Sequence, residues 1–234
     1  MSEQVPAHGA SAQMRVWDLP VRLCHWGFVI LLPILWWTAE NGEMRWHMRA
    51  GSLMLALVLF RIAWGLVGSS TARFAGFVRG PVAVISYLHA LRQRADKGAG
   101  KVLGHNPAGG WSVLILLTLL AAQAVSGLFA GDPYDGATGP LNDAVGVMRS
   151  GQLTDWHKDL GFNLILGFVA LHLLAIAIYR FGLGDRLIGP MISGKKAREP
   201  GMADMAPVPA WRAAMCAIVS AGIALWVYNG APGL

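Results

Sequence analysis

The stretch WHKDLGFNLILGFVALH, residues 156–172, combines an apolar run with a histidine near each end, His157 and His172. Apart from Asn163, every residue from 160 to 171 is apolar or glycine. At a rise of about 1.5 Å and a turn of about 100° per residue, the two histidines lie about 22 Å apart along one helix and about 60° apart around it. The stretch therefore predicts a membrane-crossing helix with an ionisable ring near each membrane face.

The composition of the whole chain agrees with a membrane protein. Of its 234 residues, 55% are hydrophobic and only 14% are charged, which is unlike a water-soluble globular protein. A membrane-crossing helix needs about 20 mainly apolar residues. Five stretches approach that length, and they predict an all-α polytopic membrane protein with helices at about 21–39, 47–68, 111–130, 157–180 and 210–228.

The distribution of charge predicts the orientation. With the N-terminus in the cytoplasm, fifteen of the nineteen Lys and Arg residues lie on the cytoplasmic side, as the positive-inside rule requires. The opposite side then holds four basic and seven acidic residues, a net charge of −3. We therefore expect a bacterial inner membrane protein with a periplasmic C-terminus. The overall charge of +6 reflects the inner membrane face, so no nucleic acid partner is expected.

Motifs of other protein classes are missing from the sequence. Cys24 and Cys216 belong to no CxxC or CxxCH pattern, so neither a disulfide framework nor covalent haem is expected. No dinucleotide-binding or phosphate-loop motif occurs, and no constellation of a catalytic nucleophile or general acid and base is found. Residues 94–110 and 194–209 are interpreted as linkers between helices.

Four histidines fall at two depths of the predicted bundle. His25 begins the first helix, level with His172, and His47 begins the second helix, level with His157. Ionisable residues within a span are costly and usually functional, although a single one can also be an interfacial or hydrogen-bonded histidine. Zinc requires three or four converging ligands, whereas two facing imidazoles suffice for a bis-histidine b-type haem. The two pairs therefore favour two non-covalent haem b groups.

Other residues are candidates for contacts with these haems. Gly51 and Gly161 each lie four residues after a histidine, where a flat ring could approach the backbone, although glycine is also common in membrane helix packing. Arg61 lies fourteen residues after His47, about 21 Å further in. It is a candidate propionate partner for the inner haem, with snorkelling to the cytoplasm as the alternative. Arg45 and Arg49 are candidates for the outer haem.

The remaining histidines and nearby polar groups suggest a second kind of site. His8 lies in a polar tail and His89 in a basic loop, so both are expected to be solvated. His105 precedes the third helix on the side of the inner pair and could contact a propionate or a quinone. Polar and protonatable groups gather there close to apolar helix ends, and the candidate quinone site comprises Trp17, Asp18, Arg22 and His105.

Five motifs in order resemble the bacterial cytochrome b561 family, in the branch of the b-type cytochrome subunit of nickel-iron hydrogenases. They are WDLPVRLCHW (17–26), HMRAGSLMLALVLFRIAWGLVG (47–68), GHNPAGG (104–110), the opening stretch (156–172) and GPMISGKK (189–196). The resemblance covers about residues 14–197. It implies a four-helix bundle holding two b haems through His25, His47, His157 and His172, the four histidines already paired by depth. The spacing of fifteen residues between the last two is one longer than in many relatives.

The resemblance also implies domains and function. We expect a flexible tail at 1–14, a four-helix di-haem core at 15–197, and a linker with a fifth transmembrane helix at 198–234. Relatives pass electrons between the quinone pool and a periplasmic partner such as a hydrogenase or a c-type cytochrome, which makes an electron-transfer subunit of a respiratory chain the leading hypothesis. The alternatives are a membrane anchor that docks a periplasmic enzyme and a stand-alone superoxide:quinone-type oxidoreductase. The oligomeric state is not predicted.

Overall fold

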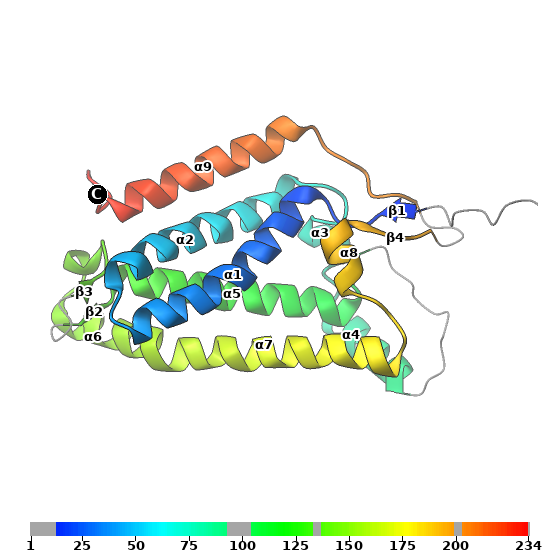
Figure 1. Cartoon of the computed structure of the whole chain (residues 1–234), viewed down its shortest axis with the longest axis horizontal. Coiled ribbons are helices and arrows are strands. Elements are labelled where there is room, and N and C mark those ends of the chain that lie inside the picture. The colour runs from blue at the N-terminus through cyan, green and yellow to red at the C-terminus, as the bar shows by residue number, and fades with distance from the viewer. Residues whose placement is uncertain (1–12, 93–103, 133–136, 199–202, 234) are drawn as a thin grey trace, which may run out of the picture.

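A computed structural model describes residues 13–92, 104–132, 137–198 and 203–233. Five long helices run roughly along one axis of the molecule (Figure 1). Each is long and apolar enough to cross a membrane, which confirms the all-α polytopic fold. Their bounds are α1 (Leu19–Glu40), α2 (Met44–Val67), α5 (Pro107–Phe129), a continuous fourth helix over 147–182, and α9 (Ala210–Tyr228).

The fourth helix is built from four consecutive segments. α6 (Val147–Asp155) leads into a π-helical turn, η2 (Trp156–Leu160), which is followed by α7 (Gly161–Ala177) and a second π-helical turn, η3 (Ile178–Gly182). The helix therefore starts ten residues earlier than the predicted 157. α6 escaped the sequence prediction because it is polar on much of its surface, whereas the search for spans follows apolar runs.

The four-helix core is held together at its centre by apolar side chains from every helix. α2 packs extensively against α1, α5 and α9, and α5 packs against α7. The central cluster contains Leu31 from α1, Met54 and Val58 from α2, Leu117 and Leu120 from α5, and Ile165 from α7. Because this cluster lies midway along the helices, polar side chains are left for the two ends of the bundle.

One end of the bundle, which we call the β1–β4 end, carries a two-stranded antiparallel sheet. β1 (Gln13–Arg15) pairs with β4 (Lys195–Ala197), and Met14 is only 1% exposed. The predicted flexible tail therefore extends two residues too far, because residues 13 and 14 belong to this sheet. Residues 1–12, which include His8, lie outside the described residues.

Short helices also gather at the β1–β4 end (Figure 1). They are α3 (Phe74–Phe77), α4 (Pro81–Arg92) and α8 (Ile188–Ser193). His89 lies on α4 and is exposed, so it is solvated as expected but is helical rather than part of a loop. The predicted linker 94–110 is also too long, because Asn106 caps α5 and the helix begins at Pro107.

The other end, which we call the β2–β3 end, is closed by the connection between α5 and α6. It contains β2 (Gly131–Asp132) paired with β3 (Ala137–Thr138) and a 3-10 turn, η1 (Asn142–Ala144). Asn142 donates to the Phe129 carbonyl at 2.9 Å and to the Ser150 hydroxyl at 2.6 Å. These bonds tie the end of α5 to the start of the fourth helix.

The fifth helix, α9, lies along α2 on the side away from α7 (Figure 1). Ala224 and Val227 pack with Leu55 in a separate apolar cluster, and the Ser52 hydroxyl donates to the Ala224 carbonyl at 3.5 Å. α9 is therefore an addition to the outside of the bundle.

Candidate functional site

At the β2–β3 end, the structure brings His47 and His157 together. Their ring centroids are 6.0 Å apart and the ring planes are inclined by 85°. The Nδ1 of His47 is 2.9 Å from the Leu35 carbonyl oxygen, and the Nδ1 of His157 is 2.9 Å from that of Gln123. Because a carbonyl only accepts, each Nδ1 carries the proton and each Nε2 keeps a free lone pair. Both rings are thus in the tautomer that a metal requires at Nε2.

The π turn explains the spacing between His157 and His172. A π turn closes its hydrogen bonds between residues i and i+5 and so holds more residues than an α turn. η2 contains His157, and the Gly161 amide donates to the Trp156 carbonyl across it. The wider turn takes up the extra residue of the fifteen-residue spacing and reduces the angular offset of about 60° expected for a regular α-helix.

Near His157, Gly161 has a different role from the predicted one, and a second glycine, Gly127, lies against the ring. A Cβ at Gly127 would lie 2.6 Å from Cε1 of the His157 ring, so the absence of a side chain lets the ring lie against α5. A Cβ at Gly161 would meet the Gln123 side chain at 2.4 Å and Trp156 at 2.7 Å. Gly161 therefore makes room for protein groups, and Gly127 is the glycine in contact with a candidate ligand. Gly127 could not be found from the sequence, because His157, the residue that it contacts, is distant along the chain.

At the β1–β4 end lie His25 on α1 and His172 on α7. The Nδ1 of His172 is 3.4 Å from the Ser112 hydroxyl. The Nδ1 of His25 is buried and has no hydrogen-bond partner, although buried ring nitrogens usually have one. His25 and His172 thus lie at the same end of the bundle, and their ring nitrogens are held less firmly than those of His47 and His157.

Arg61 extends this cluster into the interior of the bundle. It is only 5% exposed, and its Cζ lies 5.0 Å from the centre of the Phe74 ring. Its Nη1 is buried without a hydrogen-bond partner. A buried guanidinium of this kind needs an anion, and the side chain does not snorkel to the cytoplasm.

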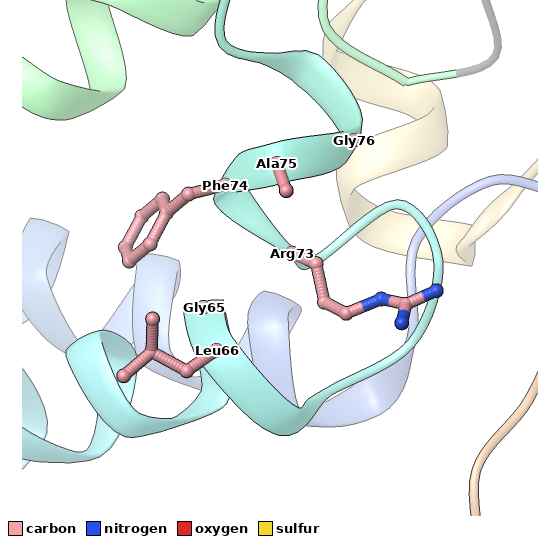
Figure 2. A pocket seen from close by; sticks show the side chains of 6 residues that line it. All are labelled: Gly65, Leu66, Arg73, Phe74, Ala75 and Gly76. Carbon is pink, nitrogen blue, oxygen red and sulfur yellow. The ribbon is translucent and has the colours of Figure 1, made fainter.

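A cavity of about 430 Å³ lies beside Phe74, between the end of α2 and α3. In Figure 2 the Phe74 ring points toward α2, whereas the Arg73 guanidinium points away from that ring. A Cβ at Gly65 would lie 2.1 Å from the Phe74 ring, so Gly65 allows the aromatic ring to close over the helix and shield Arg61.

The four candidate quinone residues lie at the β1–β4 end, but two of them have structural partners. The Asp18 carboxylate accepts from the Val21 amide at 2.8 Å, capping α1, and from the Trp64 indole at 2.9 Å. The Arg22 guanidinium donates to the Ile192 carbonyl. These contacts use both Asp18 oxygens, so the carboxylate holds α1 to α2.

His105 is placed differently from Asp18 and Arg22. Its ring lies between Trp17 and Phe77, with centroid separations of 4.5 Å to each, and its Nδ1 is buried without a partner. Burial, followed by the positive charge of Arg61, lowers the pKa of His105 to about 3. The ring is therefore neutral at physiological pH, and its Nδ1 has no hydrogen-bond partner.

Arg45 and Arg49, the candidates for the outer haem, do not approach the His47–His157 pair. Arg45 and Arg49 are exposed, and each is two residues from His47, about 200° around the helix. The Arg49 guanidinium instead lies 5.1 Å from the Trp46 ring centre. A Cβ at Gly51 would find only Leu35, at 4.0 Å, so the space beside this glycine is open.

The separation of the His47 and His157 rings fits a haem between them. Two metal–imidazole bonds of about 2 Å each, plus the half-widths of the rings, place the ring centroids about 6 Å apart, and the outer pair is at 6.0 Å. Among the described residues, no three His, Cys, Asp or Glu side chains converge on one point. Nη1 of Arg61, which has no hydrogen-bond partner, suits a carboxylate such as a propionate.

The sequence matches the family described as prokaryotic cytochrome b561 over residues 16–194. The chain belongs to the prokaryotic cytochrome b561 family. It is 26% identical over 212 residues to the probable Ni/Fe-hydrogenase B-type cytochrome subunit of Bradyrhizobium diazoefficiens. The aligned region covers 77% of this chain and 85% of the relative. No solved structure matches the chain.

Family membership confirms the resemblance found from the motifs. The protein is a membrane b-type cytochrome that binds haem b and takes part in electron transfer. The family match ends at residue 194, before α9, so the fifth helix of this cytochrome lies outside the part shared with the family.

Proposed function

We propose that this cytochrome holds two b haems, one between His25 and His172 and one between His47 and His157, and moves electrons across the membrane. The observation that carries the proposal is the His47–His157 pair at one end of the bundle, with ring centroids 6.0 Å apart, together with His25 on α1 and His172 on α7 at the other end. Each haem supplies a one-electron couple when bound. Two such groups in line along the helices would connect the two membrane faces.

The residues of the chain control how the haems are held. The Leu35 and Gln123 carbonyls fix the outer rings and raise their basicity through Nδ1. Arg61 would neutralise a propionate of the inner haem, and Phe74 covers the guanidinium. Around these polar groups, the apolar cluster of the four helices excludes water.

We infer the orientation of the protein in the membrane, and the position of the quinone site, from the residues at the β1–β4 end. Most basic residues lie at this end of the chain's helices, so we place it in the cytoplasm and the C-terminus in the periplasm of the bacterial inner membrane. Quinone would bind here beside the inner haem. His105, with its unpaired Nδ1, is the residue proposed to contact the quinone, with Trp17 packed on its ring, whereas Asp18 and Arg22 support the surrounding fold.

The redox partner is proposed to dock at the opposite end. The described acids there, Glu40, Glu43, Asp143, Asp155 and Asp159, are all exposed. An acidic surface guides a basic partner to the outer haem by electrostatic attraction. The relative named as a hydrogenase cytochrome subunit supports a periplasmic hydrogenase-like enzyme, and a c-type cytochrome has the same requirement for a basic face.

The conduit is tested by following electrons from quinol to the outer haem. In the His25→Ala variant, reduction of the outer haem by quinol should slow by at least about tenfold, because the inner haem that relays the electron has lost a ligand. Stopped-flow spectra at the haem α-band measure this rate, and dithionite provides the control, since it should reduce the outer haem in both proteins. Equal rates with quinol in wild type and variant would contradict the conduit.

A further inference from the structure

The contacts of Gln123 single out this residue among the polar groups near the outer pair. Gln123 and His157 are joined twice. The His157 ring donates from Nδ1 to the Gln123 backbone carbonyl at 2.9 Å, and the Gln123 side chain donates from Nε2 to the His157 backbone carbonyl at 2.7 Å. The ring and the backbone of one residue are therefore both held by the other.

The bond from the Gln123 side chain to the His157 carbonyl lies at the π turn. A π turn widens the helix at His157 and loosens the regular hydrogen-bond ladder of the helix. In a membrane, backbone groups freed in this way must find a partner within the protein. The Gln123 amide donates to the carbonyl of His157, the residue within this turn whose ring is a candidate haem ligand.

The Gln123 amide has room because residue 161 is glycine. A Cβ at Gly161 would lie 2.4 Å from Oε1 of Gln123, so any larger residue at 161 would displace the side chain. The same Oε1 is buried and has no hydrogen-bond partner. An unpaired oxygen costs free energy, which the bond from the Gln123 amide to the His157 carbonyl offsets.

We propose that the Gln123 side chain is a positioning residue that clamps the π turn and thereby fixes the orientation of the His157 ring toward the outer haem. The inference rests on the proposed function, since it concerns a ligand of that haem. A firmly held ring keeps a short bond from Nδ1 to the Gln123 carbonyl, which raises the basicity of the imidazole and stabilises the oxidised iron. Loosening the ring should therefore raise the midpoint potential.

The test uses Gln123→Met, which keeps the length and volume of the side chain but removes the donor. At a fixed potential near the wild-type midpoint, the ratio of reduced to oxidised outer haem should rise about three- to tenfold, as expected for loss of one hydrogen bond. The low-spin ferric EPR signal of the same haem should also change, because its highest g value depends on the angle between the imidazole planes, 85° here. Gly161→Ala should produce the same changes by displacing the amide.

Two controls separate the possible outcomes. Gln152→Met makes the same substitution at an exposed position of α6 and should leave both readouts as in wild type, while the inner haem reports correct folding in every variant. A wild-type potential and EPR signal in Gln123→Met, or in Gly161→Ala, would overturn the clamp. A wild-type protein with no haem at His47 and His157 would instead overturn the proposed function.

Discussion

Alanine at either histidine of one pair is expected to remove one haem and spare the other. His25→Ala and His172→Ala should both lose the haem of the β1–β4 end, whereas His47→Ala and His157→Ala should both lose that of the β2–β3 end. Loss of one axial ligand weakens retention of a non-covalent haem. Haem per protein should fall by about half in each variant, and spectra of the remaining haem should sort the four variants into two classes.

His89→Ala is the matched control for these variants. It removes an exposed histidine on α4 and should retain both haems with the wild-type spectrum. Grouping of His25→Ala with His157→Ala would show that the pairing across the helices is wrong. Four variants with one common spectrum would mean that the histidines do not hold two distinct haems.

Gly127→Ala is expected to have an effect nearly as large as loss of a ligand. The added methyl would lie 2.6 Å from the His157 ring, and the ring would have to leave its place against α5. Because close-packed interiors resist such shifts, the outer haem should be lost from most molecules while the inner haem is retained. The measurement is the ratio of haem to protein together with the spectrum of the haem that remains.

Gly167→Ala serves as the control for this substitution. It adds the same methyl to a glycine of α7 that has nothing within 4 Å of the added carbon, so both haems should be kept. Full retention of the outer haem in Gly127→Ala would show that the ring is free to move and that its placement against α5 is unimportant.

The bundle could be predicted from the sequence because its determinants are local along the chain. Apolar runs of sufficient length locate the five spans, and the regular rise of a helix places His25, His47, His157 and His172 at two depths. Arg61 was found in the same way, since its distance along α2 from His47 is set by helix geometry alone. The structure brings all five residues to the predicted ends of the bundle.

Features that depend on contacts between helices could not be predicted. The π turn at His157, the Gln123 carbonyl that fixes its ring and the close approach of Gly127 all depend on how α5 packs against the fourth helix. Arg45 and Arg49 were proposed from their position along the chain, but their direction around α2 leaves them exposed. Asp18 was predicted to belong to the quinone site, and only its contacts with Val21 and Trp64 reveal that it caps and anchors α1.

The number of haems in the purified protein tests the central claim most directly. Acid-acetone extraction followed by a pyridine haemochrome assay, referred to protein concentration from amino-acid analysis, measures it without assumptions about the partner. Because His47 and His157 are paired at one end of the bundle and His25 and His172 lie at the other, we expect two haem b per chain, both extractable. One haem per chain, or haem that stays covalently bound, would contradict the account.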